Sequence, residues 1–331
     1  MPALNVALLG YGTVARALHG LLVRQRDALA REHRVTFTIT GVASRRIGWR
    51  ADAAGLDPDA PTGDAYRGVR DWLVASRADV VFEAIALEPF TGQPALDYLR
   101  AALEHGAHAI SANKGPIVHG YRVLTQLAAR MGRTYRFESA VMDGAPLFSL
   151  VRECLPLAGL RAVRGVFTST ATVVIEAVEE GLSVDDGIAR AQELGIAESD
   201  PSYDVDGWDS AVKLCAVANV LLDGDLRPAQ VEREGIRGLS SNQIRLAGAE
   251  GHPYRLVGDV RRDDAGRLRA RVAPSRCEPA GGLAVKGTTL VTHLEADVFP
   301  GGLTITSHRP DPVTTAYGML ADLVSVTRVH G

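Results

Sequence analysis

Residues 5–15 decide the fold, and they read Asn5-Val6-Ala7-Leu8-Leu9-Gly10-Tyr11-Gly12-Thr13-Val14-Ala15. The apolar run at the start is typical of a buried parallel strand, and the leucines that follow at 18, 21, 22 and 29 have helical spacing. Strand, glycine turn and helix in direct succession are the context that a dinucleotide-binding motif requires. The sequence therefore predicts dinucleotide binding at this turn.

Each small residue of the turn has a physical role. Gly10 permits the tight turn, Gly12 lets the backbone approach a pyrophosphate, and Ala15 replaces the third glycine where helix and strand pack closely. The N–H groups at the start of the helix face the phosphates. The expected cofactor contacts at this turn are Gly10, Gly12, Thr13 and Val14.

The end of the second predicted strand, residues 37–43, bears on the choice of dinucleotide. It lacks the acidic residue that would hold the ribose hydroxyls and continues instead as Ser44-Arg45-Arg46. A hydroxyl and two guanidinium groups suit a 2′-phosphate, so Arg45 and Arg46 favour NADP(H) as cofactor. The alternative is a solvated basic turn, because arginine is common in exposed loops.

Composition indicates a two-domain enzyme of the cytoplasm. The 331 residues are 46% hydrophobic and 23% charged, which is enough for substantial cores. A net charge of −3 offers no basic field for nucleic acid or an anionic membrane, so neither is expected as a partner. Three widely spaced cysteines suit a reducing compartment. We find no targeting pattern and no apolar run of about 18 residues.

A second candidate site follows the strand expected over residues 107–112, which ends at Asn113-Lys114-Gly115-Pro116. Ligands of open α/β sheets bind beyond the carboxyl ends of the strands. Asn113 and Lys114 are therefore candidate cofactor contacts, and Lys114 is a candidate to polarise a carbonyl and donate a proton. The alternative is a solvated lysine in the turn before the helix predicted over residues 117–131.

The third chemistry-bearing segment is residues 198–213, E-S-D-P-S-Y-D-V-D-G-W-D-S-A-V-K. Its carboxylates crowd the entry to an apolar helix. Asp209 and Lys213 are four residues apart, which makes them neighbours on one helical face. The alternative is an acidic helix start with a solvated ion pair.

Taken in order, these motifs resemble those of the homoserine dehydrogenase family. The matching segments are residues 10–14, 111–116, 138–141, 191–195 and 198–213. The chain is most similar to the short form of the family, which lacks a fused aspartokinase and a C-terminal ACT domain, since residues 316–323 resemble the final helix. The resemblance covers nearly the whole chain and implies a homodimer that acts on a small amino acid.

The resemblance also implies roles for individual residues. Lys114 and Lys213 flank the reacting carbonyl or hydroxyl, and Asp209 shares the catalytic role. Glu198 and Asp209 hold the ammonium and hydroxyl of the amino acid, with Asp204 as a supporting carboxylate. The substrate-facing loop keeps one threonine of the family pattern, Thr170.

A monovalent cation, Na⁺ or K⁺, is implied near residues 138–145. Its ligands match Glu138 and the backbone carbonyls of Val141 and Met142. Asp143 stands where the family usually has glycine.

Three departures from the family bear on the substrate and the cofactor. Residues 168–173 replace an Asn-Gly-Thr-Thr-Asn-Tyr loop, Ile196 replaces a tyrosine, and residues 307–311 replace a Gly-Pro-Gly-Ala-Gly loop over the cofactor. They keep two alternatives open: a dehydrogenase for another amino-acid semialdehyde or hydroxy amino acid, and a non-catalytic NADP(H) sensor.

The expected architecture is α/β. A Rossmann-type, doubly wound nucleotide-binding domain of residues 1–137 and 307–331 encloses an α+β substrate-binding and dimerisation domain of residues 138–306. Within the latter, residues 165–172 are expected to form a strand and residues 174–180 a helix. Residues 48–68 are expected to form a surface excursion. The expected reaction is hydride transfer between aspartate 4-semialdehyde and L-homoserine.

Overall fold

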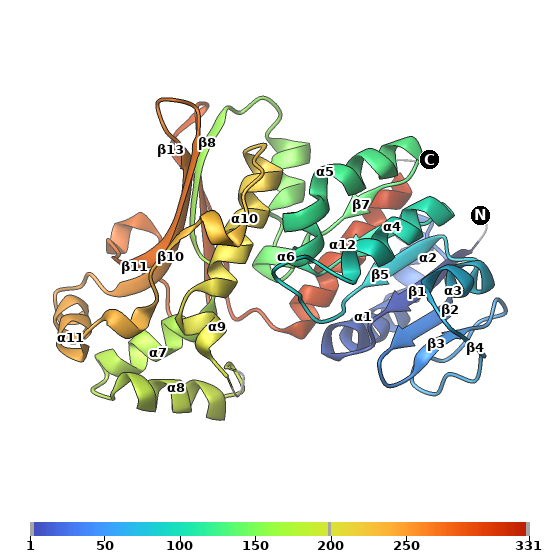
Figure 1. Ribbon diagram of the computed structural model, residues 1–331, viewed down its shortest axis with the longest axis horizontal. Helices are drawn as coiled ribbons and strands as arrows, with labels where there is room; N and C mark the ends of the chain where they lie inside the picture. Colours follow the sequence, from blue (N-terminus) through green and yellow to red (C-terminus); the bar gives the residue numbers. More distant parts are fainter. Residues whose placement is uncertain (1–2, 198–199, 329–331) are drawn as a thin grey trace. The chain divides into compact units, whose positions relative to one another are not determined.

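The structure is a computed structural model that describes residues 3–197 and 200–328. It divides into two compact units. The first comprises Met1–Pro146 and Asp311–Gly331, and the second comprises Leu147–Pro310. The first and the last described segments of the chain therefore belong to the same unit, as the blue and red parts of Figure 1 show.

The first unit is built on a seven-stranded sheet with the order β4-β3-β2-β1-β5-β6-β7. Strands β2, β1, β5, β6 and β7 are parallel, and β3 and β4 add an antiparallel edge. The strands are β1 (Leu4–Leu9), β2 (Phe37–Ser44), β3 (Gly48–Ala51), β4 (Asp64–Tyr66), β5 (Val80–Glu83), β6 (His108–Ser111) and β7 (Tyr135–Arg136). Strand order reverses between β1 and β5, so ligands are expected at the carboxyl ends of these strands.

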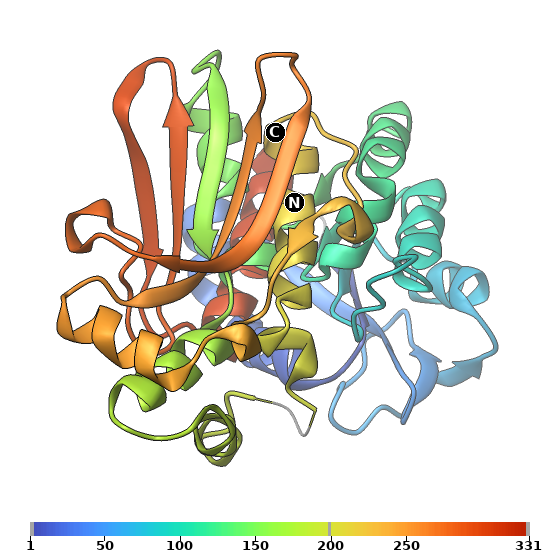
Figure 2. The same cartoon turned by 60° about the vertical axis from the view of Figure 1, so that its left-hand side comes forward.

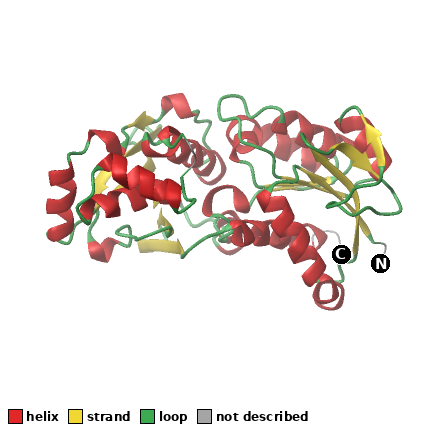
Figure 3. Ribbon diagram, turned by 90° about the horizontal axis from the view of Figure 1, so that it is seen from below, coloured by secondary structure: helices red, strands yellow, loops and turns green. Residues whose placement is uncertain are grey.

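Helices cover both faces of this sheet (Figure 3). Alternate residues of β1 point to opposite faces: Val6 and Leu8 join a core with α1 and α12, whereas Ala7 and Leu9 join one with α3 and α4. The helices are α1 (Thr13–Arg24), α2 (Arg26–His33), α3 (Val69–Ser76), α4 (Ala95–His105), α5 (Lys114–Arg130), α6 (Ser139–Met142) and α12 (Pro312–Arg328). This is the doubly wound nucleotide-binding fold that the sequence predicts.

The second unit has a six-stranded sheet with the order β13-β12-β8-β10-β11-β9 (Figure 2). Its pairings are antiparallel except that of β11 with β9. The strands are β8 (Leu160–Val166), β9 (Glu232–Arg233), β10 (Tyr254–Arg262), β11 (Leu268–Arg276), β12 (Leu290–Ala296) and β13 (Phe299–Ser307).

Helices α7 and α10 of this unit pack on β10. Its helices are α7 (Ser169–Glu179), α8 (Val184–Glu193), α9 (Ser202–Val205), α10 (Trp208–Leu221) and α11 (Ser241–Ala249). A π-helical turn (Leu150–Cys154) and three 3₁₀ turns (Pro228–Gln230, Ile236–Gly238 and Pro279–Gly281) complete it.

The structure corrects two expected elements. Residues 169–172, expected in a strand, open α7, because Thr170 and Thr172 are buried there and packing overrides the strand preference of threonine. The excursion over residues 48–68 contains β3 and β4, which extend the sheet.

The boundary of the first unit lies beyond residue 137. Helix α6 packs on α12. The Glu138 backbone N–H donates to Asp322 Oδ2 (2.8 Å), and the Ser139 hydroxyl donates to the Thr315 carbonyl (2.5 Å). These bonds explain why the unit extends to Pro146.

Candidate functional site

A cavity of about 770 Å³ lies in the first unit at the carboxyl ends of its central strands. Its walls come from the turn after β1, the end of β2, the residues after β5, and single side chains of β3, α1 and α4. The lining residues are Leu9, Gly10, Tyr11, Gly12, Arg16, Ala43, Ser44, Arg45, Arg46, Trp49, Ala84, Ile85, Ala86, Pro94 and Tyr98. This is the strand edge at which the order of the sheet reverses.

The glycine turn leaves room for a phosphate. Gly10 has a φ of +93°, and a Cβ there would lie 2.5 Å from the Ala84 carbonyl oxygen, so only glycine fits. A Cβ at Gly12 would meet no heavy atom of the described residues within 4 Å. Helix α1 begins at Thr13 and Val14, beside this open space, where its N–H groups suit an anion. The predicted turn residues therefore fit a dinucleotide pyrophosphate.

The β2–β3 hairpin forms another wall of the cavity. Arg45 and Arg46 are exposed in its turn, where the Ile47 N–H donates to Ser44 Oγ (3.1 Å). Trp49 follows on β3 and meets Tyr98 of α4 edge to face, with ring centroids 5.3 Å apart. Aromatic rings beside guanidinium groups suit a purine and its ribose phosphate.

Sequence reasoning missed both aromatic residues. A signal for Trp49 was available, because one of only three tryptophans in the chain stands three residues after Arg46. Tyr98 carried no such signal, since it belongs to a helix that the sequence presents as an ordinary amphipathic one.

A buried carboxylate fixes the start of α5. Glu83, at the end of β5, accepts hydrogen bonds from Ser111 Oγ at Oε2 (2.5 Å) and from Asn113 Nδ2 at Oε1 (3.3 Å). Asn113 caps α5 by accepting from the Gly115 N–H (3.0 Å), and its own N–H donates to Ser111 Oγ (3.0 Å). Lys114 is the first residue of this helix.

Glu83 was also missed from the sequence. Burial raises its pKa, the direction expected for a carboxyl removed from water. An acid that closes an otherwise apolar strand, residues 80–83, was the available signal.

The Asp209–Lys213 pair lies at the start of α10 in the second unit. Lys213 Nζ is 3.1 Å from Asp209 Oδ2 and donates to the Phe167 carbonyl (2.7 Å). The two residues are only 8% and 7% exposed, so the alternative of a solvated surface pair is wrong. A buried ammonium held by a carboxylate and a carbonyl is equipped for proton transfer.

Thr170 and Asp204 lie together in the same unit. Thr170 Oγ1 donates to Asp204 Oδ2 (2.7 Å) and to the Ile196 carbonyl (3.4 Å). The neighbouring Asp206 instead pairs with Arg237 (3.0 Å). Glu198, the remaining predicted substrate contact, lies outside the described residues.

The predicted cation segment is buried. Glu138 and Val141 are 4% and 0% exposed. Asp143 adopts a left-handed conformation with φ +48°, which explains how it occupies a position where glycine is usual. In residues 3–197 and 200–328, no three His, Cys, Asp or Glu side chains form a group that could hold a metal ion.

The segment at 307–311 ends as a helix cap. Asp311 Oδ1 accepts hydrogen bonds from the N–H groups of Val313 and Thr314, both 2.8 Å, at the start of α12. Asp311 therefore starts the helix that returns the chain to the first unit.

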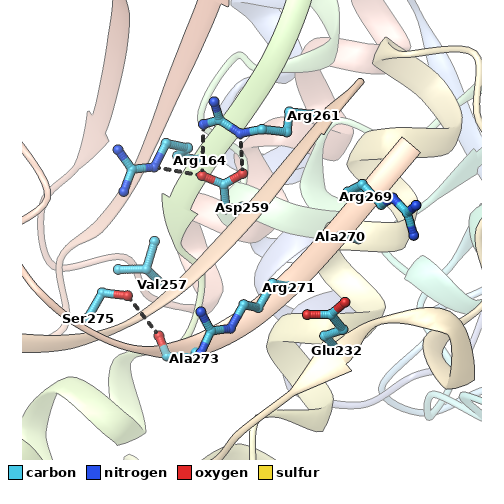
Figure 4. Close-up of a pocket in the computed structure, with 10 residues that line it drawn as sticks. All are labelled: Arg164, Glu232, Val257, Asp259, Arg261, Arg269, Ala270, Arg271, Ala273 and Ser275. Atoms are coloured by element: carbon cyan, nitrogen blue, oxygen red, sulfur yellow. Dashed lines mark hydrogen bonds and ion pairs between the residues drawn. The ribbon is translucent and has the colours of Figure 1, made fainter. Parts of the chain in front are cut away.

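A separate cavity of about 370 Å³ lies on the sheet of the second unit. Figure 4 shows Arg164 and Arg261 on either side of Asp259, each with Nε 2.9 Å from a carboxylate oxygen. None of the residues predicted from the sequence lines this cavity. No helix in the described part of the chain is both long and apolar enough to cross a membrane.

Comparisons with known proteins agree over nearly the whole chain. Residues 146–324 match the family described as homoserine dehydrogenase, and residues 10–138 match the NAD-binding domain of homoserine dehydrogenase. An NAD(+)-dependent homoserine dehydrogenase of Pseudomonas canavaninivorans is 30% identical, with 98% of this chain and 97% of the relative covered.

A homoserine dehydrogenase of Methanocaldococcus jannaschii is 26% identical, with 98% of each chain covered. The crystal structure of a putative homoserine dehydrogenase from Archaeoglobus fulgidus superposes with a TM-score of 0.84 and 28% identity. That superposition covers 97% of this chain and 98% of the other.

Proposed function

Because the chain belongs to the homoserine dehydrogenase family, we propose that it is a cytoplasmic, NAD(P)-dependent enzyme that interconverts aspartate 4-semialdehyde and L-homoserine. The observation that carries this proposal is the buried Asp209–Lys213 pair. In this pair, Asp209 holds the ammonium of Lys213, a proton donor, in a fixed orientation. The other unit of the chain has the glycine turn expected to bind a dinucleotide.

The nicotinamide, when bound, supplies the hydride to the aldehyde carbon or accepts it from the alcohol. Hydride delivery leaves an alkoxide. The Lys213 ammonium stabilises this negative charge and donates a proton from Nζ to the alkoxide oxygen. Asp209 and the Phe167 carbonyl hold Nζ in a fixed position for this proton transfer. Lys114 is the second ammonium in the proposal. Two hydrogen bonds, from Asn113 Nδ2 to Glu83 and from the Gly115 N–H to Asn113 Oδ1, fix the start of its helix.

For the amino-acid end of the substrate, we propose the polar groups around the start of α10. Asp204 and Thr170 form one hydrogen-bonded pair there. Glu198 and Asp209 bind the ammonium and the hydroxyl.

We propose NADP(H) as the preferred cofactor. The support is that Arg45 and Arg46 line the cavity and that β2 ends in Ser44 rather than in an acid. NAD is the second candidate, because the Pseudomonas canavaninivorans relative is described as NAD(+)-dependent.

The test is oxidation of L-homoserine with NADP⁺ and with NAD⁺, alongside a panel of other hydroxy amino acids. Efficient turnover of homoserine supports the proposal. Turnover of a different member of the panel favours the related dehydrogenase, for which the observation is Ile196 in place of tyrosine. Cofactor binding without turnover of any member favours the sensor.

We also propose a homodimer and a monovalent cation near Glu138 and Val141. The resemblance to the family supports both. Sedimentation of the purified chain tests the dimer, and activity in K⁺, Na⁺ and choline buffers of equal ionic strength tests the cation.

A further inference from the structure

The segment between β3 and β4 brings a carboxylate to the dinucleotide turn. Asp59 lies near the middle of this segment. Its Oδ1 accepts hydrogen bonds from Arg16 Nη1 (2.6 Å) and from the Tyr11 hydroxyl (2.9 Å). Tyr11 and Arg16 both line the cavity that contains Gly10 and Gly12. A residue that sequence reasoning placed in a surface excursion is therefore bonded to two residues that line the candidate cofactor cavity.

The segment is anchored at both ends. The Leu56 N–H donates to the Ile39 carbonyl (2.8 Å), and Arg50 Nη1 donates to the Gly63 carbonyl (3.3 Å). Between these anchors, Asp57 Oδ1 accepts from the Asp59 N–H (2.9 Å). These bonds hold the Asp59 carboxylate beside α1.

Arg16, Tyr11 and His19 form a cluster around the Asp59 carboxylate. The Arg16 guanidinium carbon lies 4.5 Å from the centre of the Tyr11 ring, and His19 Nδ1 is 2.8 Å from the Tyr11 hydroxyl and 3.6 Å from Asp59 Oδ2. Burial, followed by the hydrogen bond to Asp59, raises the pKa of Tyr11. The phenol therefore stays protonated and serves as a donor.

We propose that Asp59 sets the affinity for the cofactor by competing with its phosphate oxygens for the Arg16 guanidinium. The inference rests on the proposed use of NAD(P). Arg16 is the fourth residue of α1, the helix that begins directly after Gly12, where an anion is favoured. Asp59 contacts Arg16 through Nη1, and a phosphate oxygen that takes this N–H displaces the carboxylate.

Cofactor binding then exchanges the Asp59 ion pair for a phosphate contact, and the free energy needed to break that pair lowers the affinity. The phosphate has two possible sources. The pyrophosphate is present in NAD and NADP, whereas the 2′-phosphate is present in NADP alone.

Dissociation constants for NADH and NADPH test this inference without any turnover. In low-salt buffer, Asp59→Asn should tighten binding by about three- to fivefold, because the exposed ion pair with Arg16 no longer has to be broken before the phosphate binds. Tightening of both cofactors identifies the pyrophosphate, and tightening of NADPH alone identifies the 2′-phosphate. The effect should shrink at high salt, since the side chains of Arg16 and Asp59 are 42% and 55% exposed.

Two further variants make the test specific. Arg16→Met should weaken binding, and in its background Asp59→Asn should have no further effect. Asp64→Asn is the matched control, because it removes an exposed carboxylate of β4 with the same change in charge. It should leave both dissociation constants unchanged.

The inference is overturned if Asp59→Asn leaves both dissociation constants within twofold of wild type or weakens them. It is also overturned if the effect persists in the Arg16→Met background. If the wild-type protein binds neither NADH nor NADPH, the proposed function itself fails, which distinguishes the two failures.

Discussion

Lysine is rare in this chain, and its positions are informative at the scale of single residues. Of the 36 basic residues, 33 are arginine, and the lysines are Lys114, Lys213 and Lys286. Arginine keeps its proton at every accessible pH, whereas a lysine can release one. Two of the three lysines occupy the positions where the proposed chemistry needs a proton donor.

We expect Lys213→Ala to lower kcat by at least about a hundredfold, because it removes a charge that acts mainly in the transition state. Lys213→Arg should have a kcat almost as low as that of Lys213→Ala, since a guanidinium cannot supply the proton. Steady-state kinetics and NADPH titration measure both effects, with the exposed Lys286→Ala as control. Near-normal kcat in either Lys213 variant would remove Lys213 from the mechanism.

Glu83 provides a second residue-scale prediction, now with pH as the variable. Its raised pKa means that the folded chain holds this proton more tightly than the unfolded chain does. The stability contributed by the protonated group is complete below the unfolded pKa, and it is lost as pH rises through the folded pKa.

Glu83→Gln keeps the shape and an acceptor oxygen but never ionises. The stability of this variant relative to wild type should therefore increase from pH 5 to pH 8, as measured by thermal unfolding. Glu83→Ala should lower kcat as well, because Asn113 loses one of the hydrogen bonds that fix the start of α5, where Lys114 lies. A pH-independent difference between Glu83→Gln and wild type would show that Glu83 does not titrate in this range.

At the scale of elements, the β2–β3 hairpin is the part of the fold to which the proposal for NADP(H) assigns the choice of cofactor. It places two guanidinium groups in a tight turn and Trp49 on the strand that follows. A mononucleotide-binding strand usually ends in one residue that reads the ribose. In this chain the candidate groups, Arg45 and Arg46, lie in the turn between two strands, so replacing their side chains leaves the pairing of β2 with β3 unchanged.

Replacing Arg45 and Arg46 together by Ala should weaken NADPH binding by about ten- to a hundredfold and leave NADH nearly unchanged, because only NADPH carries the 2′-phosphate. Trp49 lines the same cavity, so quenching of tryptophan fluorescence is a direct readout. Trp49→Phe is the control that assigns the signal to this ring. Equal losses for both cofactors would instead assign the arginines to the pyrophosphate.

At the scale of the whole molecule, the two ends of the chain meet in one core. Helix α12 packs on α1, and Leu323 is fully buried in the cluster that contains Val6 and Leu18. The core of the first unit therefore includes a helix that follows the whole second unit in the sequence.

Leu323→Ala should lower the free energy of unfolding by about 2–5 kcal/mol, the cost of a cavity in a packed core. Denaturant unfolding of the full chain measures this loss. Val313→Ala on the same helix is the control, since Val313 is 44% exposed, and it should change stability by less than about 0.5 kcal/mol. A small effect of Leu323→Ala would mean that α12 contributes little to the core.

The sequence by itself determined the features that depend on neighbouring residues. The glycine turn, the helix that follows it and the strand that ends at Asn113 are specified by spacing and by backbone freedom within a few residues. The resemblance to homoserine dehydrogenases rests on the same local motifs, and the family comparisons confirmed it.

Only the tertiary structure decided which side chains are removed from water and which distant groups meet. The spacing of Asp209 and Lys213 is also compatible with a solvated ion pair, and only their burial excludes that alternative. Glu83, Tyr98 and Asp59 each contact a residue that is dozens of positions away in the sequence. Packing also decided that residues 169–172 are helical despite their threonines. Burial and long-range contact depend on the whole chain, so no local pattern of residues could specify them.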